Sequence, residues 1–123
     1  MASKTFVKKL LLAFMILNHL VGCVAHHAGP EVLDNGVRFT LSAPTATSVA
    51  IAGSFNRWNP HQNLLSGPDQ RGVWSALFFI PPGRHEYLFV INNEKWMPDP
   101  FAPSVSDGMG GENSVLIVDE PEP

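Results

Sequence analysis

The 123-residue sequence predicts an all-β sandwich, on the strength of three observations. Short runs of apolar or alternating apolar and polar residues recur between residues 37 and 118. Clusters of Gly, Pro, Asn and Asp separate these runs, as is typical of turns between strands. No segment in this range has a sustained helical period with capping residues at its ends. Repeated short strands of this kind pack as two sheets around one core.

Strand signals occur at residues 37–41, 47–52, 73–80, 84–92 and 114–118. The first segment alternates, with Val37, Phe39 and Leu41 on its inward face. The third is apolar almost throughout, which predicts a central strand covered on both faces. A tight turn at Pro81-Pro82-Gly83 then makes residues 84–92 the hairpin partner of that strand.

A second hairpin turn is predicted at Asn92-Asn93, because Asn tolerates the left-handed backbone conformations of such turns. This turn brings Trp96 back beside the preceding strand. Asp99-Pro100 is most simply a turn that the Asp side chain closes on its own backbone. Alternation also predicts an aromatic core, made of Phe39, Phe55, Trp74, Tyr87 and Phe89.

Residues 1–22 have the features of a lipoprotein signal peptide: a basic start, an apolar stretch and a small residue before Cys23. Leu20-Val21-Gly22-Cys23 resembles a bacterial lipobox, in which cleavage precedes the cysteine and lipid is attached to it. Cys23 is the only cysteine of the chain, and an unpaired thiol is otherwise a liability in a secreted protein. An ordinary secretory signal or a buried structural thiol is the alternative.

Lipid on Cys23 would anchor the protein stably to a membrane if several acyl chains are attached, since one chain alone binds marginally. The next residue is Val24 and not Asp. In lipoproteins of enteric bacteria this favours export to the outer membrane. The expected location is therefore the cell envelope, at the outer membrane or the periplasmic face.

Four parts follow from this reading: the signal peptide at 1–22, a lipidated tether at 23–35, the sandwich at 36–118 and an acidic tail at 119–123. The 101 residues left after processing suffice for one small domain. They carry five basic and eleven acidic residues, a net charge of −6. An acidic domain of this kind has no electrostatic footprint for nucleic acid, so a neutral ligand is expected.

No metal or cofactor is expected. The adjacent His26 and His27 lack Cys or carboxylate partners at ligand spacing, which makes them a weak metal signal. His61 is expected in a loop and His85 on a strand surface, and neither has a Ser or Cys partner in a recognisable catalytic context.

Two tryptophans, Trp58 and Trp96, lie in turn-rich segments next to strands. Each could simply pack on the core of its own domain, as large aromatic residues commonly do. However, residues 49–58 and 82–90, followed by Trp96, Asp99-Pro100 and Asn113, resemble the glycogen-binding module of the AMP-activated protein kinase β subunit. That module belongs to carbohydrate-binding module family forty-eight, close to the early set domains of isoamylases and branching enzymes.

The resemblance runs in order from about residue 37 to residue 118. It implies an immunoglobulin-like early set sandwich that binds α-1,4-linked glucan, such as glycogen or starch, without cleaving it. It also implies roles for four residues. Trp58 and Trp96 stack on sugar rings, Asn113 bonds sugar hydroxyls, and Met109 replaces a leucine that inserts into the curl of the glucan.

Two positions depart from the pattern of the kinase module. Gly111 stands where that module has a threonine, and Leu88 stands where it has a lysine that faces sugar oxygens. Lys95, beside Trp96, is a candidate substitute, although its direction cannot be read from the sequence. The departure at Leu88 keeps a second function open: a protein-interaction or regulatory early set module that has lost sugar binding.

Catalysis is not expected. A glycosidase needs two carboxylates roughly 5 to 10 Å apart across the scissile bond. Carboxylates are available, but a single small sandwich leaves no room for a deep cleft. In the enzymes of the resembled family, a separate catalytic barrel follows the sandwich. The chain itself is therefore not expected to be an enzyme. A separate carbohydrate-active enzyme is a candidate partner.

Overall fold

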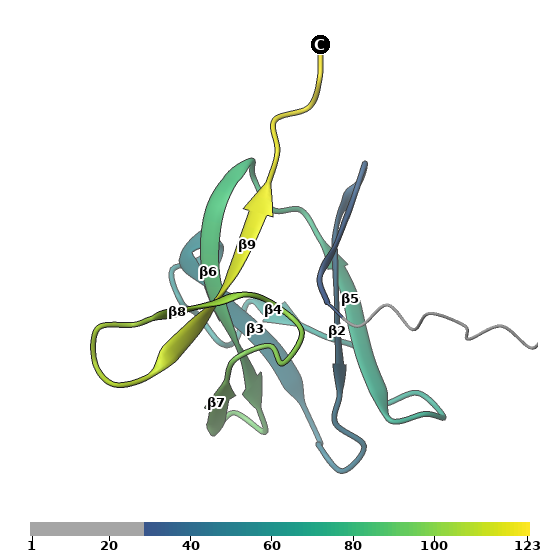
Figure 1. Ribbon diagram of the computed structural model, residues 1–123. Coiled ribbons are helices and arrows are strands. Elements are labelled where there is room, and N and C mark those ends of the chain that lie inside the picture. Colours follow the sequence, from purple (N-terminus) through teal and green to yellow (C-terminus); the bar gives the residue numbers. More distant parts are fainter. Residues whose placement is uncertain (1–28) are drawn as a thin grey trace, which may run out of the picture.

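The computed structural model describes residues 29–123. The predicted signal peptide, Cys23, Val24 and the two adjacent histidines lie outside the described residues. The predicted immunoglobulin-like β-sandwich is confirmed: nine strands form two antiparallel sheets, with no α-helix among the described residues (Figure 1). One 3₁₀ turn, η1 (Ser54–Asn56), follows the third strand.

The smaller sheet has three strands in the order β1-β2-β5. They are β1 (Glu31–Leu33), β2 (Gly36–Ser42) and β5 (Val73–Phe78). The predicted alternation of β2 is confirmed, because Val37, Phe39 and Leu41 are buried and the residues between them are not.

The larger sheet has six strands, which are β4 (Asn63–Leu64), β3 (Val49–Gly53), β6 (Gly83–Ile91), β9 (Glu112–Val118), β8 (Ser104–Ser106) and β7 (Lys95–Met97). The nine-residue β6 is its central strand. On one side it pairs with β3; on the other, its first half pairs with β9 and its last three residues pair with β7. This shared strand brings β3, β7 and β9 together (Figure 1).

The core lies between the two sheets. Phe39, Trp74, Tyr87 and Phe89 are buried there as predicted, and Phe55 packs against them from η1. The Phe39 and Tyr87 rings meet edge to face with their centroids 5.3 Å apart. This geometry is favourable for aromatic pairs beyond the area that they bury.

The predictions for residues 73–92 were wrong in two respects. Strand β5 is the edge of the smaller sheet and not a covered central strand, and β6 lies in the other sheet and is not its hairpin partner. Leu77 and Phe79 are accordingly exposed, Phe79 to 79%. The two prolines in the connection lack backbone N–H groups, so this segment crosses between the sheets without extending a hairpin ladder.

The segment predicted as a tether contains a strand. Residues Glu31–Leu33 form β1 and pair with β2. Gly29 lies against the β7–β8 connection, since a Cβ at this position would be 3.1 Å from the carbonyl oxygen of Phe101. The sandwich therefore begins before residue 36. Residues 119–123 carry no strand.

The second predicted hairpin is confirmed. Asn92 and Asn93 have φ angles of 55° and 57°, and the chain returns as β7 beside β6. The Oδ1 atom of Asn92 also accepts a hydrogen bond of 2.8 Å from the backbone N–H of Thr47. The turn is thereby tied to the β2–β3 connection.

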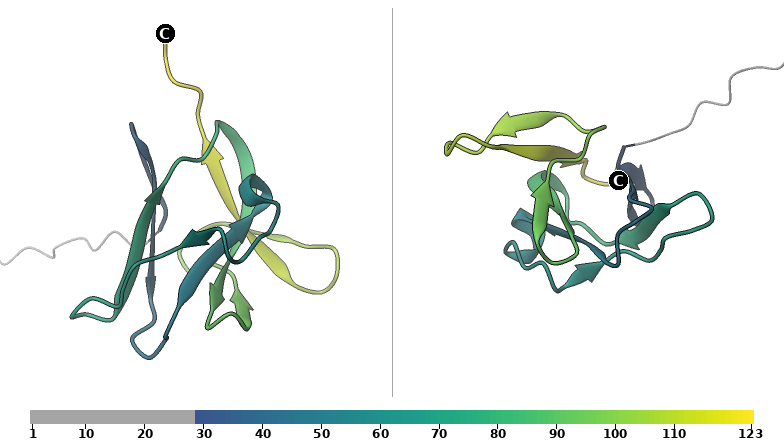
Figure 2. Two further views of the ribbon diagram at one scale, coloured as in Figure 1. Left: turned by 180° about the vertical axis from the view of Figure 1, so that it is seen from behind. Right: turned by 90° about the horizontal axis from the view of Figure 1, so that it is seen from below.

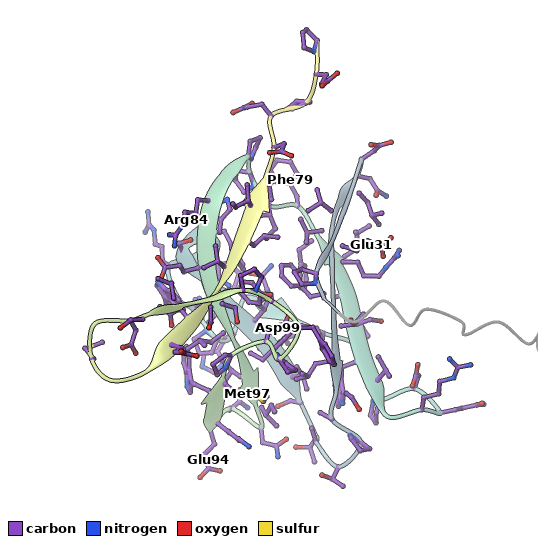
Figure 3. The ribbon with its side chains drawn as sticks, in the orientation of Figure 1. Glu31, Phe79, Arg84, Glu94, Met97 and Asp99 are labelled. Atoms are coloured by element: carbon purple, nitrogen blue, oxygen red, sulfur yellow. The ribbon has the colours of Figure 1, made fainter. Side chains whose placement is uncertain are left out.

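Asp99 closes its own turn, as predicted, by accepting a 2.9 Å hydrogen bond from the N–H of Phe101. The structure adds a buried network around Asp99, whose position Figure 3 marks. The Tyr87 hydroxyl donates to Asp99 Oδ2 at 2.7 Å, and the N–H of Asp99 donates to Ser114 Oγ at 2.7 Å. Burial raises the pKa of Asp99 above its ordinary value despite these donors.

This pKa predicts how Asp99 affects stability. The folded protein retains a proton that the unfolded chain releases near pH 3.8, so the contribution of Asp99 to stability is lost as the pH rises through the folded pKa. We expect the stability of the wild type, relative to Asp99→Asn, to fall as the pH rises above about 4, the ordinary pKa of an Asp. Urea unfolding of both proteins at a series of pH values measures it. A difference that grows with pH would contradict the raised pKa.

Candidate functional site

The candidate site lies on the outer face of the six-stranded sheet, turned away from β2 and β5 (Figure 1). Successive residues of a strand point to opposite faces. In β6, Tyr87 and Phe89 point into the core, so Arg84, Glu86, Leu88 and Val90 point outward.

Strand register places four apolar residues in one row across this face. Leu64 lies opposite Ala50, Ala50 opposite Val90, and Val90 opposite Trp96. Neighbouring strands are about 4.8 Å apart, so the row spans roughly three such steps. Its ends are open to solvent, with Leu64 56% and Trp96 43% exposed.

Trp58 lies on the middle of the row. It packs against Ala50, Ala52 and Val90, and its side chain is half-buried. Two small alanines leave space on the sheet for a large flat ring. The two tryptophans therefore flank Val90 on one face, as the sugar-binding hypothesis requires.

The turn that presents Trp58 is built around Asn56, which is buried. Asn56 Oδ1 accepts a 2.9 Å hydrogen bond from the N–H of Gly53, and its Nδ2 donates to the Ile51 carbonyl oxygen at 3.0 Å. Nδ2 also donates to Asn63 Oδ1 at 2.8 Å. Trp58 itself has a φ angle of 59°, a left-handed conformation that these contacts hold in place.

Replacing Asn56 should therefore cost stability. Asn56→Ala removes two buried and two part-buried hydrogen bonds and leaves backbone groups unsatisfied, so we expect the free energy of unfolding to fall by about 2 to 4 kcal/mol. Asn59→Ala is the matched control, because the Asn59 side chain accepts one exposed bond, from the N–H of His61. Urea unfolding compares the two variants, and equal losses would contradict the role of Asn56.

Met109 projects from the β8–β9 hairpin, which extends away from the body of the sandwich (Figure 2). It is 87% exposed. Asp107 Oδ1 closes the loop by accepting hydrogen bonds from the N–H groups of Met109 and Gly111, at 2.7 and 3.0 Å. A Cβ at Gly111 would lie 2.6 Å from Asp107 Oδ2. A side chain at this position would therefore require the Asp107 carboxylate to shift.

Asn113 lies on the same face of β9. The paired register ends at Tyr87 with Ser114; continued by one step, it puts Asn113 opposite Leu88. Its Nδ2 donates to Glu86 Oε1 at 3.3 Å, and Arg84 Nη1 contacts Glu86 Oε2 at 3.0 Å. These hydrogen bonds, first that from Arg84 and then that from Asn113, lower the pKa of Glu86.

The register does not bring Lys95 to this face. Lys95 lies opposite Ile91, which packs toward the core, and so does Met97, two residues further along β7. Because side chains alternate along a strand, Lys95 points to the side of β7 opposite Trp96. Leu88 thus occupies the middle of the face with no cation from β7 beside it.

Sequence reasoning missed four residues of this arrangement: Leu64, Asn56, Arg84 and Glu86. Strand β4 has only two residues, which is too short for a periodic signal. The outward direction of Arg84 and Glu86 follows from the alternation of β6, but their pairing with each other and with Asn113 depends on the position of β9.

Within residues 29–123, no three His, Cys, Asp or Glu side chains gather as a metal site. In the same range, no helix is long and apolar enough to cross a membrane. His85 is half-buried, and its Nε2 atom makes a 2.7 Å hydrogen bond with the carbonyl oxygen of Pro81. His61 lies in an exposed turn.

Residues 36–123 match the family described as the glycogen recognition site of AMP-activated protein kinase. The chain belongs to this family. Its members are carbohydrate-binding modules, which are non-catalytic domains, and the predicted resemblance to the kinase module is confirmed.

The chain is similar to proteins of three kinds. The chain is 36% identical over 86 residues to a 1,4-alpha-glucan branching enzyme GlgB of Francisella tularensis, covering 63% of this chain. It is 32% identical over 74 residues to the chloroplastic PTST homolog 2 of Arabidopsis thaliana, covering 60% of this chain. It is 30% identical over 76 residues to the SNF1 protein kinase subunit beta-2 of Saccharomyces cerevisiae, covering 62% of this chain. The matched part spans only 13%, 13% and 18% of these relatives.

Proposed function

We propose that this chain binds α-1,4-linked glucan, as in glycogen or starch, on the outer face of its six-stranded sheet and does not cleave it. The observation that carries the proposal is the pair of tryptophans, Trp58 and Trp96, on either side of Val90. Membership in a family of glycogen-recognition modules supports it, as does the similarity to a 1,4-alpha-glucan branching enzyme.

The chemistry of the face suits a neutral sugar polymer. Glucose rings present C–H patches that stack on flat aromatic side chains, and their hydroxyls need polar partners at the edges. Trp58 and Trp96 supply the rings, Asn113 supplies an amide, and Met109 supplies a pliable apolar contact from the projecting hairpin. A single site of this kind binds weakly, because the polymer loses conformational freedom.

Affinity electrophoresis of residues 29–123 tests the proposal. We expect retardation in native gels that contain glycogen or amylopectin, and normal mobility in gels that contain dextran, whose linkages are α-1,6. Normal mobility in all gels by a folded domain would contradict the proposal. Equal retardation by dextran would contradict the linkage preference.

The second candidate function is a protein-interaction or regulatory module without sugar binding, with a carbohydrate-active enzyme as its partner. The observation that favours it is Leu88, which places an apolar side chain where the kinase module has a sugar-facing lysine. Lys95 does not compensate, since it points to the other side of β7. A folded domain that no glucan retards would favour this function.

We also propose that the chain is a lipoprotein of the cell envelope, anchored by lipid on Cys23 at the outer membrane or the periplasmic face. The lipobox-like sequence and the single cysteine support the proposal. Expression in a bacterial host with radiolabelled palmitate tests it. The wild type is expected to carry label and to sediment with membranes, and Cys23→Ala to lose both. Label that persists in Cys23→Ala would contradict the anchor.

A further inference from the structure

We propose that Glu86, held by Arg84, is a positioning residue that orients the side-chain amide of Asn113, so that the amide oxygen accepts a hydrogen bond from a glucan hydroxyl. The inference rests on the proposed glucan binding and adds to it two residues outside the predicted site. Neither Arg84 nor Glu86 stacks on a sugar ring, and their role lies in the direction that they impose on Asn113.

The contacts form a chain from β6 to β9. Arg84 Nη1 contacts Glu86 Oε2 at 3.0 Å, and the other carboxylate oxygen, Oε1, accepts from Asn113 Nδ2 at 3.3 Å. Arg84 and Glu86 are two residues apart on one strand, so they share its outer face. Each oxygen of the Glu86 carboxylate thus has its own donor.

The direction of the Asn113 amide follows from the chemistry of its partner. An amide has a donating nitrogen and an accepting oxygen, whereas an ionised carboxylate only accepts. The nitrogen of Asn113 must therefore face Glu86, and the oxygen must point the other way. The lowered pKa of Glu86 keeps the carboxylate ionised at neutral pH, and so maintains this orientation.

The free oxygen faces the half of the sheet that carries the tryptophans. Along the outer face of β6, Glu86 precedes Leu88 and Val90, and the β6–β9 register, continued one step past Tyr87 and Ser114, puts Asn113 opposite Leu88. Glu86 is on one side of Asn113, and Val90, which both tryptophans flank, is on the other. A sugar stacked on the tryptophans would meet an acceptor at its edge, which suits a hydroxyl that donates.

A double-mutant cycle tests the proposal. Maltoheptaose is titrated against wild type, Glu86→Ala, Asn113→Ala and the double variant, and binding is followed by tryptophan fluorescence. If Glu86 acts through Asn113, each single variant binds about threefold to tenfold more weakly than the wild type. The double variant is then no weaker than Asn113→Ala alone. Glu86→Gln, which keeps an acceptor oxygen, is expected to recover part of the loss.

Losses that multiply in the double variant would overturn the inference, because they would mean that Glu86 acts on the sugar independently. Unchanged binding by Glu86→Ala would also overturn it. Both results leave glucan binding itself intact, whereas a wild type that binds neither maltoheptaose nor glycogen would overturn the proposed function together with the inference.

A measurement without sugar provides a second readout. The two side-chain N–H protons of Asn113 give separate NMR signals, and the one that faces Glu86 is expected to shift in Glu86→Ala and less in Arg84→Met. The backbone signals of residues in β3 serve as the control for folding. An Asn113 side-chain signal that is unchanged in Glu86→Ala would overturn the orienting contact.

Discussion

Trp58→Ala is expected to abolish the retardation of the domain by glycogen and to weaken maltoheptaose binding by about 30-fold or more, the usual scale for a tryptophan at the centre of a contact. Trp58 lies over the middle of the apolar row, against Ala50, Ala52 and Val90. Its removal exposes these small side chains and leaves Trp96 as the only ring beside Val90. Affinity electrophoresis and fluorescence titration measure the two losses.

Phe79→Ala is the matched control for Trp58→Ala. Phe79 is another exposed aromatic residue, but Figure 3 places it at the upper end of the molecule, whereas β7, marked by Met97, lies at the lower end. We expect unchanged retardation. Trp58→Phe, which keeps a flat ring, is expected to retain part of the binding. A Trp58→Ala domain that stays folded and is retarded like the wild type would refute the predicted platform.

Gly53→Ala is expected to have the largest effect on stability, a loss of about 3 kcal/mol or more in the free energy of unfolding. A Cβ at Gly53 would lie 2.6 Å from the Glu86 carbonyl oxygen, 2.7 Å from Phe55 Cε1 and 2.8 Å from Tyr87 Cβ. All three belong to packed backbone or core, so none can move cheaply. Because Trp58 donates its N–H to the Gly53 carbonyl oxygen at 2.9 Å, glucan binding should weaken as well.

Gly110→Ala separates this crowding from the general cost of replacing a glycine. Gly110 has a φ angle of 91° and no atom within 4 Å of an added Cβ. Its replacement should cost only the strain of a left-handed backbone, about 1 to 2 kcal/mol. Thermal and urea unfolding compare the two variants. If Gly53→Ala lowers the free energy of unfolding no more than Gly110→Ala does, the close packing around Gly53 does not make that position intolerant of a side chain.

Local sequence patterns determined several elements of the fold. The alternation of Val37, Phe39 and Leu41 predicted both a strand and its buried face, because a strand with one covered side must alternate. The Asn92-Asn93 pair predicted the hairpin before β7, because few other residues adopt two successive left-handed conformations. The resemblance then predicted that Trp58 and Trp96 act together, and the packing of Trp58 against Val90, which lies opposite Trp96, puts both rings on one face.

Local sequence patterns did not predict which strands pair with each other. The apolar run at 73–80 predicts a strand, but its composition does not distinguish a central position from an edge, and β5 is an edge. The direction of Lys95 depends likewise on its register with Ile91. In both cases the outcome is decided by which strand lies alongside, which is a long-range contact.

The polar contacts beside the tryptophans depend on tertiary structure for the same reason. Asn113 and Glu86 are 27 residues apart in the chain, and only the pairing of β6 with β9 brings the amide to the carboxylate. Residue type and local period therefore determined the longer strands and the Asn92-Asn93 turn, and the family resemblance pointed to the aromatic residues of the site. Tertiary structure alone decided which side chains surround the aromatics, because hydrogen bonds between distant strands leave no periodic trace in the sequence.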